Sequence, residues 1–207
     1  YEIVSRDWSS DVCSSDLGSS GKDTLAAFIT AFEVMARVGG GGPQGVGRKL
    51  HRRGLHPTSV FGRIGAAVAA AVLMRLTPQQ IEYAIGAATT TAGGMVGSFG
   101  THAKPFHGGK AAMDGILAAE LAKEGFQSSN KLLELEKGIY DVFIQTRDRP
   151  VDIPPMDFSY WEIKRNGFKP YAACRATHAS IQSSRKLASQ VAGRKINKVH
   201  IKVHPNV

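Results

Sequence analysis

The residues of this chain whose types and spacing could do chemistry are concentrated in 100–110, which reads Gly-Thr-His-Ala-Lys-Pro-Phe-His-Gly-Gly-Lys. Histidine exchanges protons near neutral pH, and two histidines beside one lysine disfavour its charged form whenever either is protonated. Glycines let the backbone approach a ligand closely, and the N-terminus of the apolar helix that follows favours an anion. The segment could therefore hold a carboxylate and move a proton beside it. A solvated basic loop is the alternative interpretation.

A second basic cluster, at residues 53–62, contains His56 followed by Pro57 and Thr58. A residue before proline is held in an extended conformation, and Thr58 can cap the helix that follows. His56 is therefore predicted at a helix N-terminus on a constrained turn, where it could transfer protons. A surface histidine that happens to precede a helix is the alternative.

A third cluster, at residues 167–178, contains Lys169, Cys174, Arg175 and His178. It falls at a predicted domain boundary, and ligand sites favour such boundaries. Cys174 with His178 could form a thiol nucleophile pair, but on a helix this spacing usually brings packing neighbours together. A buried or pocket-lining cysteine is the favoured interpretation.

The two histidines of the first segment, His102 and His107, could also bind zinc if they lay on a helix. Glycine and proline argue against a helix there, and no carboxylate or third ligand has a suitable spacing. No metal site is predicted.

The overall charge of +9 and pI of about 9.7 are typical of nucleic-acid-binding proteins. The basic residues are spread along the chain, however, and aromatic residues do not interleave with them. A small anionic substrate explains a basic cleft equally well. No apolar run is long enough to span a bilayer, the start has no signal-peptide pattern, and two cysteines make no disulfide framework, so a reducing, cytoplasmic setting is expected.

The first 17 residues differ from the rest, because Ser-Ser-Asp plus an aliphatic residue occurs twice, five residues apart. This repeat resembles a translated sequencing adaptor, so residues 1–17 are predicted to be non-native or disordered. The chain stops at Val207 within a strand-like pattern, and we expect an internal fragment of a longer protein.

Helical patterns dominate residues 22–145. Thr77, Pro78 and Gln80 form the start of one helix, with a capping box, and Gly125 ends the next helix along the chain. A helix is also expected at 64–74, and a short helix at 129–135. The first predicted helix carries an apolar stripe made of Leu25, Phe28, Ile29, Phe32, Met35 and Ala36. The helix that ends at Gly125 carries a second stripe, made of Met113, Ile116, Leu117 and Leu121.

Prolines among charges and aromatics at 147–170 indicate a connection. Beyond it, 179–191 is helical, and Val199, Ile201 and Val203 alternate with polar residues as in a half-buried strand. The prediction is a mainly α protein. A large all-helical domain at 18–167 is followed by the start of a smaller α+β lid domain at 168–207.

Taken together, the clusters resemble the MmgE/PrpD family, which includes 2-methylcitrate dehydratase, cis-aconitate decarboxylase and iminodisuccinate epimerase. The resemblance covers residues 18–207. It rests on Gly-Leu-His-Pro-Thr at 54–58, Thr-His-Ala-Lys-Pro-Phe-His-Gly-Gly at 101–109, and Lys-Pro-Tyr at 169–171 with Cys-Arg-x-Thr-His at 174–178. The three matches fall in the family's order.

The resemblance implies catalytic roles for His56, Lys104 and Lys169. It implies that His102, His107, Cys174, Arg175 and His178 line the substrate site. Members have a large helical domain and a smaller α+β lid, form homodimers, and need no metal or organic cofactor. This chain lacks the family's Asp- and His-containing N-terminal segment and most of the lid, so the fragment itself is expected to be inactive. Cys174 stands where some decarboxylase-like members have histidine, which leans weakly toward the dehydratase or epimerase branches.

The resulting hypothesis is a lyase that abstracts a proton alpha to a carboxylate of a small di- or tricarboxylate, with a 2-methylcitrate dehydratase-like reaction first. Decarboxylation and epimerisation stay open, because specificity depends on pocket shape. A basic nucleic-acid-binding protein or a non-catalytic helical dimerisation protein is the alternative of another class. No nucleic-acid or membrane partner is predicted.

Overall fold

A computed structural model describes residues 17–40, 45–144 and 159–203. The chain divides after Arg165 into two compact units. Most of the predicted foreign segment (1–16) and the first part of the predicted connection (145–158) lie outside the described residues.

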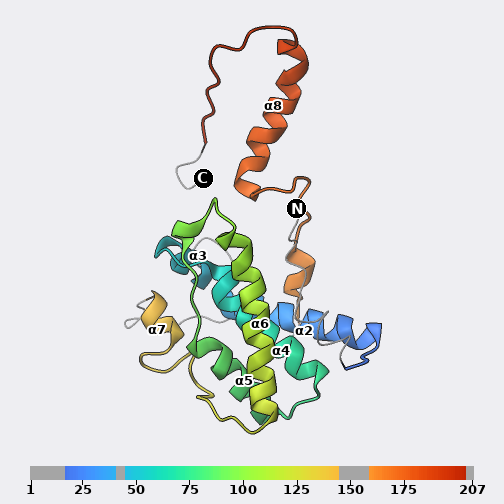
Figure 1. Ribbon diagram of the computed structural model, residues 1–207, viewed down its shortest axis with the longest axis vertical. Helices are drawn as coiled ribbons and strands as arrows, with labels where there is room; N and C mark the ends of the chain where they lie inside the picture. Colours follow the sequence, from blue (N-terminus) through green and yellow to red (C-terminus); the bar gives the residue numbers. More distant parts are fainter. Residues whose placement is uncertain (1–16, 41–44, 145–158, 204–207) are drawn as a thin grey trace. The chain divides into compact units, whose positions relative to one another are not determined.

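The described part of the unit that ends at Arg165 consists mainly of helices (Figure 1). Its α-helices are α2 (Gly21–Gly39), α3 (Val46–Arg52), α4 (Pro57–Leu73), α5 (Pro78–Thr90), α6 (Ala103–Lys123) and α7 (Ile139–Ile144). Two 3-10 turns, η1 (Val96–Ser98) and η2 (Glu162–Arg165), complete it. Helix α4 packs against α2, α5 and α6 and forms the centre of the unit.

Alanine and glycine side chains let the central helices approach closely. Ala67, Ala69, Ala70 and Ala71 of α4 are fully buried, as are Ala119 and Ala122 of α6. At Gly115 of α6, a Cβ atom would collide with the backbone and side chain around Ala66, so only glycine fits this crossing. The α4–α6 contact therefore holds the N-terminal ends of both helices in fixed relation.

Small residues, and not the predicted apolar stripes, form much of the buried face of these helices. On α6 the buried face is Ala111, Ala112, Gly115, Ala118, Ala119 and Ala122. Met113, Leu117 and Leu121 are 54%, 50% and 38% exposed, and Leu25 of α2 is 59% exposed. The stripe prediction was wrong for these residues, because close helix packing selects small side chains over large ones.

Helix α5 confirms the predicted start. The Thr77 hydroxyl accepts the Gln80 N–H, and the Gln80 side chain accepts the Thr77 N–H, which completes the capping box. Helix α6 contradicts the prediction that glycine and proline exclude a helix at 102–107, because it begins at Ala103 with His102 as its N-cap. Pro105 is tolerated because N–H groups of a first turn have no intrahelical acceptor.

The short helix predicted at 129–135 is a series of turns, and the helix comes later, as α7. Local polar side chains account for the shift. The Ser128 hydroxyl donates to the Tyr83 carbonyl, and the Ser129 hydroxyl accepts the Lys131 N–H. Such side-chain bonds compete with helix formation. Helix α3 was not predicted.

The unit from Asn166 onward holds the 3-10 turn η3 (Arg175–Thr177) and α8 (His178–Val191), which confirms the predicted helix. The predicted strand at 199–203 is wrong for the described residues. Val199, Ile201 and Val203 are 68%, 53% and 51% exposed and belong to no strand. An alternating pattern becomes a strand only where a partner strand supplies hydrogen bonds, and the described part of this unit offers none. The α+β character predicted for this unit is therefore not seen in the described residues.

A buried ion pair ties the segment just before the unit boundary to α2. Glu33 and Arg37 are each 1% exposed, with 3.2 Å between Arg37 Nε and Glu33 Oε2. The Glu33 carboxylate also accepts the N–H groups of Glu162 and Ile163, at 3.0 and 2.9 Å, and Arg37 donates to the Tyr160 carbonyl. Burial raises the pKa of Glu33, but the N–H groups of Ile163 and Glu162 and the charge of Arg37 outweigh burial and hold the pKa below its usual value.

We expect Glu33→Gln to lower the free energy of unfolding of this chain by about 3 kcal/mol, because it removes the charge of a buried carboxylate that pairs with the buried Arg37 guanidinium. Urea denaturation measures this value. Since the folded pKa lies below the ordinary value of 4.5, the pair stabilises above that value and loses its effect as pH falls through the folded pKa. The difference between wild type and variant should therefore shrink in acid. Glu162→Gln is the control, because its partner Arg165 is 71% exposed and such pairs contribute little. Equal losses for both variants would contradict the account.

None of the helices in the described ranges combines the length and apolar character needed to cross a membrane.

Candidate active site

Two segments far apart in the sequence meet at the start of α4. Leu55 and Met95 form an isolated antiparallel bridge. The His56 N–H donates to the Gly94 carbonyl at 2.9 Å, and the Val96 N–H donates to the Gly54 carbonyl at 2.8 Å. These bonds place His56, the N-cap of α4, beside the loop that leads into α6.

His56 lies in contact with a histidine from α6. Its Nδ1 is 3.0 Å from Nδ1 of His107, and the two rings are 5.2 Å apart between centroids. His107 Nε2 in turn lies 3.5 Å from the Ser98 hydroxyl oxygen. Both histidines are half-buried. We call His56 and His107 the histidine pair.

Phe99 contacts both His56 and Lys104. The Phe99 ring packs edge-to-face on His56, with centroids 4.8 Å apart, and Lys104 Nζ lies 4.5 Å from the Phe99 centroid. Because α6 begins at Ala103, Lys104 and His107 are three residues apart on one helix face. The Lys104 ammonium group and the His56 imidazole therefore border the same aromatic ring.

Three basic neighbours act on His56. Burial, followed by the charges of His107, Lys104 and His51, lowers the pKa of His56 to about 4. His56 is therefore a neutral imidazole at pH 7, able to accept a proton. An anionic ligand beside these groups would offset the positive charges and raise this pKa.

Gly94 holds the two sides of the site together. Its carbonyl binds His56, and its φ of +124° lies in a region that side chains rarely adopt. A Cβ atom there would lie 2.6 Å from the Cβ and Oγ atoms of Ser59 and 3.6 Å from Cε1 of His107. Only glycine lets the loop pass between α4 and His107.

Gly94→Ala is expected to reduce the free energy of unfolding by about 2 kcal/mol or more, because it combines backbone strain with overpacking. Thermal denaturation followed by circular dichroism measures the loss. The adjacent Gly93 provides the control, since its φ is ordinary and nothing lies within 4 Å of an added Cβ. If Gly93→Ala cost as much as Gly94→Ala, the proposed constraint at Gly94 would be wrong.

Arg63 of α4 anchors the same loop from inside the core. Its Nε is 3.0 Å from the Asp114 carboxylate of α6, and its guanidinium also donates to the Thr91 carbonyl. Lys110 pairs with Asp114 from the neighbouring turn. The Arg63–Asp114 ion pair joins α4 to α6, and the Arg63 hydrogen bond to Thr91 holds the start of the 91–100 loop against α4.

The structure brings together some of the predicted site residues and not others. His56, Lys104 and His107 share the Phe99 neighbourhood. His102 is exposed at the N-cap of α6.

The remaining predicted site residues belong to the unit after Arg165, which is described by itself. Lys169 and Cys174 are exposed, and the Cys174 thiol is free. The Arg175 guanidinium donates to the Gly167 and Phe168 carbonyls, at 3.2 and 3.5 Å. The His178 ring packs edge-to-face on Tyr171 and lies 3.1 Å from the Ala173 carbonyl oxygen. Cys174 precedes η3 while His178 begins α8, so the two do not lie on one helix as i and i+4 packing neighbours.

Sequence reasoning missed several residues of the site, namely His51, Gly94, Ser98 and Phe99. For Gly94, Ser98 and Phe99 the signal was the glycine-rich stretch at 93–100, immediately before the basic segment. Glycine in such a loop marks a close backbone approach, as Gly94 shows.

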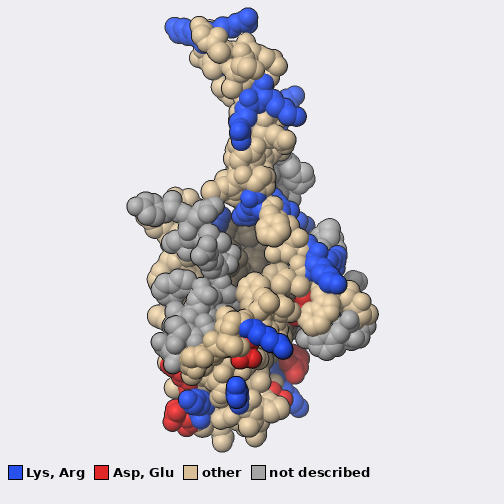
Figure 2. All heavy atoms as spheres, turned by 90° about the vertical axis from the view of Figure 1, so that its right-hand side faces the viewer, with Lys and Arg blue, Asp and Glu red and all other residues tan. Residues whose placement is uncertain are grey.

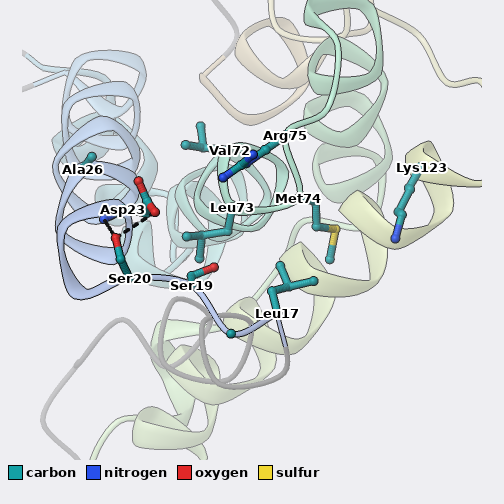
Figure 3. Close-up of a pocket in the computed structure, with 11 residues that line it drawn as sticks. Leu17, Ser19, Ser20, Asp23, Ala26, Val72, Leu73, Met74, Arg75 and Lys123 are labelled. Atoms are coloured by element: carbon teal, nitrogen blue, oxygen red, sulfur yellow. Dashed lines mark hydrogen bonds between the residues drawn. The ribbon is translucent and has the colours of Figure 1, made fainter.

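A separate pocket of about 460 Å³ lies at the other end of α4 (Figure 3). Its walls include Ser20, Asp23, Leu73, Arg75 and Lys123, and Ser20 is bonded to Asp23. Helix α4 has 17 residues, so this pocket is about 25 Å from His56 along the helix. It contains none of the predicted site residues.

No three His, Cys, Asp or Glu side chains in the described ranges are grouped so that they could hold a metal ion. The positive charge of the surface is divided among several places. Figure 2 shows Lys and Arg side chains at separated positions on the face in view, with Asp and Glu among them in its lower part.

Comparison with known proteins defines the class to which this fold and site belong. The MmgE/PrpD N-terminal domain matches residues 12–151, so the chain belongs to the MmgE/PrpD family and the resemblance seen in the motifs is confirmed.

Among individual proteins, the chain is similar to cis-aconitate decarboxylase of Mus musculus, with 32% identity over 161 residues, 77% of this chain and 32% of the relative. It is 32% identical to cis-aconitate decarboxylase of Homo sapiens over 169 residues, 77% of this chain and 32% of the relative. It is 31% identical to the cis-aconitate decarboxylase-like protein oryM of Aspergillus oryzae over 175 residues, 81% of this chain and 36% of the relative. The chain spans about a third of the length of these relatives.

Proposed function

We propose that the full-length protein is a lyase that acts on a small di- or tricarboxylate and exchanges a proton at a carbon next to a carboxylate. The observation that carries this proposal is the neutral His56, which contacts His107 and packs against the Phe99 ring that the Lys104 ammonium also contacts. A neutral imidazole beside a fixed cation can move a proton while the cation holds the carboxylate.

Each residue has a role that follows from its chemistry. His56 exchanges the proton. Lys104 binds a substrate carboxylate and stabilises enolate-like charge as it develops at the neighbouring carbon. Lys169 is proposed to bind a second carboxylate. His102, Cys174, Arg175 and His178 are proposed to line the substrate site in the full-length protein.

For the substrate, cis-aconitate is the first candidate, because the curated relatives are named as cis-aconitate decarboxylases. In such a reaction, the bond from carbon to the departing carboxylate breaks. Its electron pair moves through the adjacent double bond, and the carbon at the far end takes a proton. Proton delivery would then be the task of His56, after the substrate's negative charge has raised its pKa.

Dehydration of a 2-methylcitrate-like hydroxy acid is the second candidate. The observation in its favour is the low pKa of His56, about 4, which keeps the imidazole ready to abstract a proton. Abstraction of the α proton and departure of hydroxide from the neighbouring carbon would form the double bond and one water molecule.

A substrate panel separates these reactions. The full-length protein is incubated with cis-aconitate, 2-methylcitrate and iminodisuccinate, and the products are followed by NMR. Release of CO₂ from cis-aconitate identifies a decarboxylase, and formation of an unsaturated tricarboxylate from 2-methylcitrate identifies a dehydratase. Turnover of none of the three would argue against the proposal.

The alternatives of another class give different results. A nucleic-acid-binding protein would bind long polyanions with an affinity that falls steeply with salt, and a small tricarboxylate would give no saturable protection. A non-catalytic helical protein would be indifferent to Lys104→Ala and Lys169→Ala. The homodimer that the family resemblance implies is also part of our proposal, and sedimentation velocity of the full-length protein tests it.

A further inference from the structure

The partners around the histidine pair determine where its protons lie. The series of hydrogen bonds begins at Ser98, whose hydroxyl oxygen is 2.7 Å from the Met95 carbonyl oxygen. A carbonyl has no proton to give, so the Ser98 hydroxyl must donate in this contact. The Ser98 oxygen is then left as an acceptor toward its other neighbour.

That neighbour is His107, whose Nε2 lies 3.5 Å from the Ser98 oxygen. Since the Ser98 proton is already engaged, the contact is satisfied when His107 Nε2 carries a proton and donates it. A neutral imidazole has one N–H, so His107 Nδ1 is then the bare nitrogen. It presents a lone pair to His56.

His56 Nδ1 lies 3.0 Å from this bare nitrogen, a normal hydrogen-bond distance. Two bare nitrogens at that distance would repel, so the proton of the contact belongs to His56 Nδ1. We propose that His107 is a positioning residue that holds His56 in its Nδ1–H tautomer and leaves His56 Nε2 as the basic nitrogen of the site. The role of His56 Nε2 as a base rests on the proposed function, whereas the tautomer assignment follows from the geometry alone.

The surroundings hold both rings in the arrangement that this requires. The His56 N–H donates to the Gly94 carbonyl, and Pro57 holds the His56 backbone in an extended conformation. The Phe99 ring packs edge-to-face against the His56 ring, and His107 lies in the second turn of α6. The neutral state of His56 at pH 7 agrees with a single N–H on the ring.

The same hydrogen bond persists when His56 becomes positively charged during the reaction. When His56 Nε2 takes a proton from substrate, His56 becomes an imidazolium and its Nδ1–H still donates to His107. His107 thus remains an acceptor at the moment the positive charge forms. A carboxylate in the same place would raise the basicity of His56, whereas a neutral imidazole orients the ring without doing so.

The direct test is the tautomer of each histidine in this chain, labelled with ¹⁵N-histidine and studied by long-range ¹H–¹⁵N correlation NMR at neutral pH. His56→Gln and His107→Phe identify the two sets of signals. We expect a protonated Nδ1 and a bare Nε2 in His56, and the opposite pattern in His107. An Nε2–H tautomer for His56, or two protonated nitrogens on His107, would overturn the proposal.

Variants of His107 add a second readout. His107→Phe keeps an aromatic ring but removes the acceptor, so His56 should lose its Nδ1–H preference. In the full-length protein kcat should fall about 10²-fold. His107→Asn can place its amide oxygen near the position of Nδ1 and should restore much of the tautomer and of kcat. If His107→Phe does not fold, Ser98→Ala takes its place, because it removes the acceptor that fixes the His107 tautomer. Failure of His107→Asn to restore the tautomer that His107→Phe had lost would count against the proposal.

The two levels of inference fail separately. An Nδ1–H tautomer at His56 with no turnover of any tricarboxylate would leave the positioning role intact and refute the proposed function. Turnover with an Nε2–H tautomer at His56 would refute the positioning role and leave the function intact.

Discussion

Replacing His56 by glutamine in the full-length protein is expected to lower kcat about 10³-fold, the range that a positioned acid–base group contributes. Glutamine places a neutral amide near the imidazole position but cannot exchange a proton. Because the charged groups that hold the substrate remain, KM should change much less than kcat. Steady-state kinetics on the substrate identified by the panel measure both constants.

His200→Gln is the matched control. His200 is an exposed histidine that belongs to no helix or strand. Its replacement should leave kcat within twofold of wild type, while the melting temperatures of both variants should match wild type. A His56→Gln variant that keeps wild-type kcat would remove His56 from the chemistry.

Lys104→Met is expected to raise KM about 10- to 100-fold, since it removes a charge-assisted bond to a substrate carboxylate while keeping the length of the side chain. It should also change the pH dependence. The Lys104 charge is one of the groups that lower the pKa of His56, so its removal lets that pKa rise from about 4. The acid limb of kcat/KM, which reports neutral His56 in the free enzyme, should therefore move to higher pH.

Lys123→Met provides a lysine control on the same helix. Nineteen residues separate it from Lys104, a distance of about 28 Å along α6. It should leave KM and the pH profile unchanged. A Lys104→Met enzyme with wild-type KM and an unmoved acid limb would show that Lys104 neither binds the substrate nor influences His56.

Local signals in the sequence predicted part of this fold well. The Thr77–Gln80 capping box is decided by residues three apart, and it formed as expected. The position of His56 at a helix start follows from Pro57, which fits a first helical turn. Such features depend on neighbouring residues alone, so sequence reasoning reaches them.

Other features depend on tertiary contacts. Helix α6 extends back to Ala103 through Pro105, Gly108 and Gly109, and its small residues pack against α4, whereas local propensity argued for a loop. The same packing left Met113 and Leu117 exposed. Helix propensity and apolar period cannot say which face a neighbouring helix will cover.

The candidate site shows the same division. His56, Lys104 and His107 stood out by residue type and motif, but their relation did not. Phe99 and Ser98, which connect them, are ordinary residues whose importance comes from the Leu55–Met95 bridge that folds their loop onto α4. The pairing of His56 with His107 spans 51 positions in the sequence and rests on that bridge.

The most direct test of the central claim is deuterium transfer by the full-length protein. Wild type and His56→Gln are each incubated in D₂O with cis-aconitate and with 2-methylcitrate, and the carbon next to the carboxylate is followed by NMR. The account predicts that wild type exchanges or incorporates deuterium at that carbon, and that His56→Gln slows this step about 10³-fold. Equal incorporation by both proteins, or none by wild type, would contradict it.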